Sequence, residues 1–353
     1  MAVSPDAPGL LANLGGALAP PGDYVAPESS LLRCIELEPG NPDPVLLYCR
    51  TLRRAGDYDR ALPRLERAIN DFPGNSDLLL EKGILLIRMD DPDAAESILV
   101  QAGQVHPRPE VSVALASVAQ LRGDMERAAR LCRQAVGMDE RYGSAWGLLG
   151  RIFILQQKIG DAEACLRKVV ELAPDDAESL KLHATALGML GRHADSLVAY
   201  ERALTMQPGL PGLAYEYGLC LHRVGRSQEA IAFLRKVMAG EQKREELFGA
   251  ATNLAMIYKD LGDMRESLAA QRLAIAEPRF HSNLIFSMMY ASDVQPEEIL
   301  AEAKAYDAMH CRPLAPSEPR AFDNAPIPAR KLRIGFVSGD LRDHAVAYFV
   351  EPV

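Results

Sequence analysis

The sequence predicts an all-α fold in which helices come in pairs, followed by a short C-terminal segment with the pattern of an α/β domain. Proline recurs every 34 residues, at Pro39, Pro73 and Pro107, and again at Pro174 and Pro208. Glycine marks a turn ahead of most of these prolines, at Gly22, Gly56, Gly123, Gly191, Gly225 and Gly262. Gly closes one helix and Pro ends the next, so each period predicts two antiparallel helices.

Small residues stand seven positions before each of these glycines, at Gly15, Cys49, Ala116, Ala184, Gly218 and Ala255. Two helices approach closely only where small side chains face each other, so we expect Ala116, Gly150 and Gly218 at close crossings. The pattern resembles the tetratricopeptide repeat. Eight repeats are expected, beginning near residues 8, 42, 76, 109, 143, 177, 211 and 248. Pro27 is expected to interrupt the second helix of the first repeat, and the polar run 241–246 to absorb a longer step before the last.

Composition narrows the possible functions. The net charge is −9 and no basic stripe appears, which argues against a nucleic-acid groove. The six scattered cysteines form no CxxC pair and predict free, reduced thiols, while the histidines show no metal-ligand spacing. The first residues lack a secretory signal, and no apolar run reaches the roughly 20 residues that span a bilayer. A cytoplasmic protein without metal is expected.

The pattern changes near residue 280. We expect the repeat array over 1–279, a helical transition segment over 280–311, a proline-rich linker over 312–330 and the start of a further domain over 331–353. The transition segment predicts an apolar helix at 281–290, with Phe286 and the Met pair packed on the last repeat or on the missing domain, and a second helix from Gln295 to about His310. After the linker, the run KLRIGFVSGD predicts the first strand and turn of an α/β domain.

The run HSNLIFSMMY, the following PEEI helix and the segment RKLRIGFVSGDLRDHAVAYFVEP resemble bacterial members of the protein O-GlcNAc transferase family. This family, glycosyltransferase family 41, also contains the plant SPINDLY-type fucosyltransferases. The resemblance implies a catalytic region of two Rossmann-like halves (GT-B) that moves a sugar from UDP-GlcNAc to Ser or Thr of proteins held in the repeat groove. It also implies that the chain contains only the beginning of that region, so no cofactor site is expected within it and the 353 residues alone are expected to be inactive.

The resemblance assigns His344 to the active site near the donor sugar. The imidazole would act there as a general base or as a group that positions a substrate, and the alternative is a structural cap of the following helix. Animal-type members have a second histidine four residues further on, where this chain has Tyr348.

Animal-type members also carry a ladder of asparagines on the inner faces of their first helices, which binds the substrate backbone. The matching positions here are Asn13, Leu47, Glu81, Ala114, Leu148, Leu182, Glu216 and Asn253. Only Asn13 and Asn253 keep the amide, so these two are the candidate substrate-binding residues. A mainly apolar and acidic ladder predicts weak or selective peptide binding.

Two alternatives stay open. One is a repeat adaptor that binds partner proteins without catalysis. The other keeps the enzyme and replaces the donor with a GDP-sugar, because the donor-nucleotide pocket of the family lies in the second Rossmann half. The oligomeric state is also open.

Overall fold

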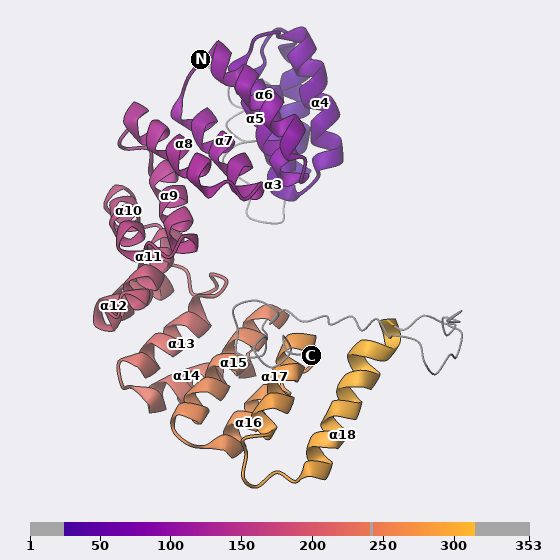
Figure 1. Cartoon of the computed structure of the whole chain (residues 1–353). Helices are drawn as coiled ribbons and strands as arrows, with labels where there is room; N and C mark the ends of the chain where they lie inside the picture. The colour runs from indigo at the N-terminus through magenta and orange to yellow at the C-terminus, as the bar shows by residue number, and fades with distance from the viewer. Residues whose placement is uncertain (1–24, 241–242, 315–353) are drawn as a thin grey trace, which may run out of the picture. The chain divides into compact units, whose positions relative to one another are not determined.

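A computed structural model describes residues 25–240 and 243–314. Seventeen α-helices, α2 to α18, make up this part of the chain, and it contains no strand (Figure 1). Their bounds are α2 Val25–Leu37, α3 Asp43–Ala55, α4 Tyr58–Asp71, α5 Ser76–Arg88, α6 Pro92–Val105, α7 Pro109–Leu121, α8 Met125–Met138, α9 Gly143–Leu155, α10 Ile159–Leu172, α11 Ala177–Met189, α12 His193–Met206, α13 Leu213–Arg223, α14 Ser227–Ala239, α15 Arg244–Asp260, α16 Met264–Arg272, α17 Pro278–Met288 and α18 Pro296–Tyr306.

The chain forms two compact units, residues 1–295 and 296–353. The described part of the first unit contains α2 to α17. In the second unit, α18 is followed by a π-helical turn, Asp307–Cys311, and a 3-10 turn, Arg312–Leu314.

Helices of the first unit stack in pairs into an α-helical superhelix. Each odd-numbered helix from α3 to α15 packs against the even-numbered helix that follows it. The first helices also contact one another directly, α3 with α5, α5 with α7, α7 with α9, α11 with α13 and α13 with α15. First helices therefore form one layer of the array and second helices the other.

The predicted repeat register is confirmed within the described residues. First helices were expected near residues 76, 109, 143 and 177, and α5, α7, α9 and α11 begin there. The five described turn glycines all adopt the left-handed conformation, with φ between 77° at Gly191 and 85° at Gly225. Gly accepts this conformation without the steric cost that a Cβ brings. Asp follows three of these glycines, and Asp57, Asp124 and Asp263 each cap the next helix by accepting a backbone N–H bond.

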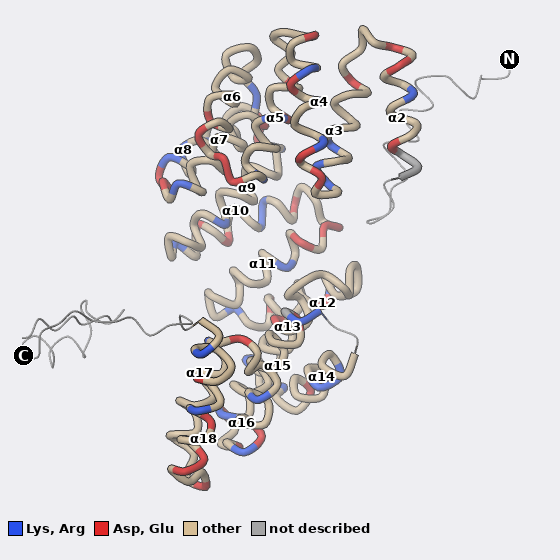
Figure 2. The backbone as a smooth tube through the Cα atoms, turned by 90° about the vertical axis from the view of Figure 1, so that its right-hand side faces the viewer, with Lys and Arg blue, Asp and Glu red and all other residues tan. Residues whose placement is uncertain are grey.

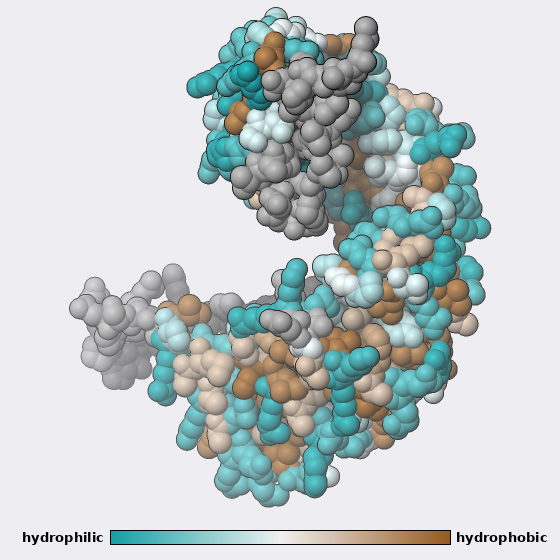
Figure 3. Space-filling view, turned by 180° about the vertical axis from the view of Figure 1, so that it is seen from behind, coloured by the Kyte–Doolittle hydropathy of each residue, from teal (hydrophilic) through white to brown (hydrophobic). Residues whose placement is uncertain are grey.

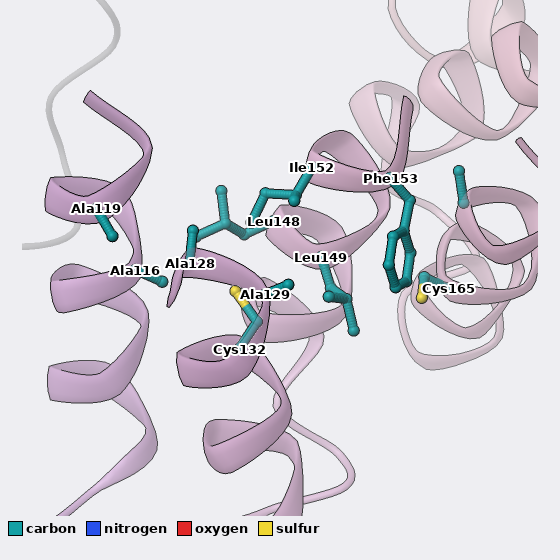
Figure 4. Packing of buried hydrophobic residues seen from close by; sticks show 11 residues of the cluster. Ala116, Ala119, Ala128, Ala129, Cys132, Leu148, Leu149, Ile152, Phe153 and Cys165 are labelled. Carbon is teal, nitrogen blue, oxygen red and sulfur yellow. The ribbon is translucent and has the colours of Figure 1, made fainter. Parts of the chain in front are cut away.

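Close helix crossings lie where the small residues predicted them. A Cβ added to Gly150 would lie 2.8 Å from Cγ of Leu166, and one on Gly218 would lie 2.6 Å from Cδ2 of Leu234. Ala116 is fully buried in the cluster of Figure 4, where α7, α8 and α9 meet around Cys132 and Leu149. Contacts of this closeness fix each first helix on its partner.

Two details of the array differ from expectation. Pro27 does not interrupt a helix: α2 begins at Val25, so Pro27 lies in the first turn, where a missing N–H costs nothing. The polar run 241–246 is not simply a spacer either. Helix α15 already begins at Arg244 and has 17 residues, so part of the longer step extends this helix.

Beyond the repeats, α17 and α18 occur where two helices were predicted. Leu284 and Met288 of α17 are buried, as expected of an apolar helix. Phe286 and Met289 are 57% and 65% exposed, so in the described structure they are not packed into the last repeat, and their packing on a further domain stays a prediction. The first three residues of the predicted linker form the 3-10 turn Arg312–Leu314, and the rest of the linker, the predicted strand and His344 lie outside the described residues.

The cysteines carry free thiols, five of them buried and Cys311 exposed. Burial raises the pKa of Cys49 and Cys132 to about 12, so these thiols stay protonated and inert. Among the described helices, none combines the length and the apolar character that crossing a bilayer would need.

Candidate functional site

A groove of about 660 Å³ runs along the first helices of four consecutive repeats, α3, α5, α7 and α9. Apart from Tyr142, which directly precedes α9, its lining comes from the first helices. Side chains three and four residues apart share one helical face, and the 34-residue period repeats that face from helix to helix. Its apolar lining includes Leu80, Ile84, Ile87, Val113, Leu121 and Leu148. Its charged lining consists of Arg50, Arg53, Glu81, Arg88, Glu110 and Arg151.

Glu81 is a buried carboxylate at the base of this groove, with only 2% of its side chain exposed. Its Oε1 accepts a hydrogen bond from Nε of Arg53 at 2.5 Å, and its Oε2 accepts one from Nε of Arg50 at 3.3 Å. Both arginines come from α3, so the carboxylate links α5 to the preceding repeat. A buried charge requires such partners, and Glu81 is therefore not available to a ligand.

Arg88 and Arg151 differ from the first two arginines. Both are exposed, and in the described residues neither side chain has an ion-pair or hydrogen-bond partner. Glu110 on α7 also lies in the groove without such a partner. The groove thus presents two cations and one anion that are unpaired in the described residues, beside apolar side chains. Figure 2 shows charges of both signs scattered over the helices of the array.

Asn253, one of the two predicted substrate-binding residues, lies on α15 at a second hollow of about 710 Å³. Its Nδ2 donates a 2.8 Å hydrogen bond to the backbone carbonyl of Tyr215, so the amide nitrogen connects α13 to α15. Its Oδ1 and the second hydrogen of Nδ2 remain for a ligand. Asn13 lies outside the described residues, and the binding role of either residue remains a prediction.

The other ladder positions are mostly closed. Ala114 and Leu148 are 6% and 3% exposed and belong to the core. Glu216 accepts hydrogen bonds from the hydroxyls of Tyr200 and Thr185, both at 3.0 Å, so this acid is also used within the fold.

Aromatic rings dominate the second hollow. Phe248 and Phe280 meet edge to face at 5.9 Å, with the guanidinium groups of Arg244 and Arg279 over them at 5.2 and 4.5 Å. Apolar side chains also reach the surface in patches among the polar ones (Figure 3). Arg244 also forms an ion pair with Glu277 at 3.9 Å, so the second hollow has a smaller surplus of positive charge than the groove of α3 to α9.

Histidines of the array make local contacts. The ring of His222 lies 2.9 Å from Oγ of Ser227 and 3.1 Å from Oδ2 of Asp260, and that of His183 lies 3.3 Å from Oε1 of Glu163. These contacts join neighbouring helices, which is the structural role expected from their spacing.

Sequence reasoning missed the groove arginines. Arg50 and Arg151 occupy the same place in their repeats, three repeats apart, and Arg88 ends α5. Aligning all first helices by the repeat period would have placed Arg50 and Arg151 on the inner face. It would not have shown which of them is neutralised, because that depends on the contact between α3 and α5.

Stacked helix pairs with a groove along their first helices define a helical-repeat scaffold. Models described as tetratricopeptide repeat match residues 52–118, 119–186, 181–241 and 249–278. Together they cover more than half of the chain, which therefore belongs to the tetratricopeptide repeat family.

The chain is similar to several known proteins at low identity. The BBSome complex member BBS4 homolog of Drosophila melanogaster is 22% identical over 186 residues, which are 52% of this chain and 38% of that protein. A tetratricopeptide repeat protein from Parabacteroides merdae is similar in structure, with 17% identity and a TM-score of 0.50 over 74% of this chain and 97% of that one. A monomeric mutant of IFIT1 with Gppp-AAAA gives 16% identity and a TM-score of 0.52 over 76% and 71%. The two structures show the fold alone.

Proposed function

We propose that the protein binds extended segments of partner proteins along the groove of α3, α5, α7 and α9. The observation that carries this proposal is the continuity of the groove over four repeats, with apolar and charged side chains side by side. A scaffold suited to protein–protein interaction follows from the family, and a relative named as a member of a complex is consistent with it.

The dimensions suit a peptide rather than a small molecule. Neighbouring helices pack roughly 8–10 Å apart, so four first helices span roughly 30 Å. An extended chain advances about 3.3–3.6 Å per residue, so about nine residues would follow the groove. Apolar side chains of the segment would contact Ile84 and Val113, and its polar groups would meet Ser117 and Gln120.

Selection from a displayed library of random 12-residue peptides tests this proposal. Ser117 is half-buried near the middle of the groove, so Ser117→Trp places a large ring across it. Arg130→Trp adds the same ring on the exposed face of α8, outside the groove, and is the matched control. We expect selected peptides to lose at least tenfold in affinity with Ser117→Trp and to bind Arg130→Trp unchanged, by fluorescence anisotropy. Peptides that bind both variants equally would contradict the proposal.

We also infer that the scaffold presents bound proteins to a glycosyltransferase domain of the O-GlcNAc transferase type. The resemblance of the segments around residues 281–300 and 330–352 supports this inference, and binding of protein segments by the repeats is consistent with it. An adaptor without catalysis, or a transferase that uses GDP-fucose, would employ the same scaffold.

Two measurements separate these possibilities. Calorimetric titration of residues 1–353 with UDP-GlcNAc should show no binding, since the family places the donor pocket in the second Rossmann half; micromolar saturable binding would contradict that placement. In a longer chain that carries both halves, His344→Ala should lower sugar transfer about 100-fold or more. Turnover from GDP-fucose alone would indicate the SPINDLY-type activity, and no turnover from either donor would favour the adaptor.

A further inference from the structure

The groove of α3 to α9 carries a positive charge in an acidic protein. Its lining contains four arginines and two glutamates, whereas the whole chain has a net charge of −9. Glu81 is paired with Arg50 and Arg53. The excess positive charge of the groove is therefore carried mainly by Arg88 and Arg151, the two arginines without a partner in the described structure.

From this surplus we propose that the partner segment is acidic, with Asp or Glu side chains that pair with Arg88 and Arg151 and apolar side chains between them. This inference rests on the proposed function and specifies the chemistry of the bound segment. A guanidinium presents a planar fork of donors that matches a carboxylate, and both guanidinium groups are free to form that pair.

Apolar neighbours strengthen such a pair. Arg88 follows Ile84 by one helical turn and Ile87 directly, and Leu121 of α7 lines the same groove. A segment that covers these side chains excludes water from the ion pair, and charge interactions are stronger in the lower dielectric. Acidic and apolar side chains on one segment would therefore reinforce each other.

A nucleic acid is the other polyanion that a cationic groove could attract. Three observations favour the peptide: in the described residues only two groove cations are unpaired, Glu110 places an unpaired carboxylate among them, and apolar side chains stand between the charges of the lining. A phosphate backbone needs a basic stripe, and a fixed carboxylate within the groove would repel it.

The experiment selects peptides from the same random 12-residue library against the wild type and against the double variant Arg88→Gln, Arg151→Gln. The matched control is Arg130→Gln, Arg167→Gln, which removes from the second helices α8 and α10 two exposed arginines that have no ion-pair or hydrogen-bond partner among the described residues. All four sites are exposed, so the variants should keep the melting temperature of the wild type, which circular dichroism checks. A fluorescein-labelled decamer of adenylate serves as the nucleic-acid probe.

We expect Asp and Glu to be enriched among peptides selected by the wild type and by the control, and not among those selected by the groove variant. Wild-type peptides should bind the groove variant at least tenfold more weakly, and changing their acids to Asn and Gln should cost as much. Groove-dependent peptides without acidic enrichment would overturn this inference and leave the proposed function standing. Peptides that bind Ser117→Trp as tightly as the wild type would contradict both this inference and the proposed function. The adenylate decamer could instead bind saturably to the wild type and fail to bind the double variant Arg88→Gln, Arg151→Gln. That result would overturn the inference and identify the ligand as a nucleic acid.

Discussion

Glu81 lies on a first helix, at a ladder position where the resemblance leads us to expect a ligand-binding side chain, and yet its role is structural. Its carboxylate is almost fully buried and accepts hydrogen bonds from two arginines of the preceding repeat. The same holds for Glu216, which Tyr200 and Thr185 hold from within the fold. Ligand contacts are therefore expected from the neighbouring exposed positions.

Removing the Glu81 carboxylate should destabilise the array. Glu81→Ala leaves two guanidinium groups unpaired and should lower the free energy of unfolding by about 2 kcal/mol. Glu110→Ala, on the next first helix, removes a groove carboxylate without such partners and should change it by less than about 0.5 kcal/mol. Urea unfolding followed by circular dichroism measures both, and equal effects would show that the pairing of Glu81 contributes nothing.

Buried thiols should make the stability depend on alkaline pH. Burial raises the pKa of Cys49 and Cys132 to about 12 and that of Cys165 to about 11, from an ordinary value near 9. A folded-state pKa above the unfolded one gives stability that is complete below about pH 9 and is lost as the pH rises toward 12. Each thiol contributes a slope of about 1.4 kcal/mol per pH unit in that window.

Cys132→Ala removes one of these thiols and should flatten the decrease in unfolding free energy between pH 9 and pH 10.5. Cys311→Ala removes an exposed thiol and should leave the slope unchanged. Guanidinium unfolding in a reducing buffer at several pH values gives both slopes. A Cys132→Ala protein with the wild-type slope would contradict the assigned cause.

At the scale of helices, small residues decide how closely a pair can pack. Helix α9 offers a direct comparison between two glycines of the same helix. A Cβ on Gly150 would meet Leu166 at 2.8 Å, whereas one on Gly147 would have its nearest contact, with Val169, at 3.9 Å. Gly150→Ala should therefore lower the unfolding free energy by about 1–3 kcal/mol through overpacking. Gly147→Ala should raise it by about 0.5–1 kcal/mol through helix propensity. Thermal unfolding that ranks the two variants the other way would mean that the crossing of α9 and α10 is misassigned.

The turn between paired helices contains one residue in the left-handed backbone conformation. In two repeats this residue is not Gly. Asp90 and Gln157 both have a φ of 60° at the place where the other described pairs have Gly. An L-residue pays roughly 1–2 kcal/mol for that conformation, so Gln157→Gly should stabilise the protein by about 1 kcal/mol. The reverse change in an equivalent turn, Gly123→Ala, should destabilise it by a similar amount. Calorimetric melting temperatures that move in the same direction for both would refute this account of the turn.

The sequence alone predicts elements of this kind well and contacts between them poorly. Gly123 and Gly191 mark turns because their conformation is a local property of the chain, and the period then sets the start of each first helix. The pairing of Glu81 with α3 joins residues about thirty positions apart, and no local pattern indicates it. For the same reason Arg88 and Arg151 could not be told apart from the neutralised arginines before the helices were stacked.

At the scale of the whole array, each repeat contacts mainly its neighbours, and the buried residues fall into successive clusters along the chain. The binding surface of the array is therefore built by adding equivalent faces of successive first helices, and a ligand must be long to gain affinity. The groove along α3 to α9 meets this requirement, and its surplus of arginine sets the preference for an acidic segment.

Photocrosslinking of a library-selected peptide tests the central claim most directly. The peptide carries a diazirine analogue of leucine at one apolar position, and mass spectrometry identifies the residues of the protein to which it attaches. The groove predicts attachment to first-helix residues such as Ile84, Ile87 and Leu121. It also predicts that Arg88→Gln with Arg151→Gln reduces the yield at least tenfold. Attachment mainly to the second helices α4, α6 and α8, or a yield that the double variant leaves unchanged, would contradict the claim that the inner groove binds an acidic protein segment.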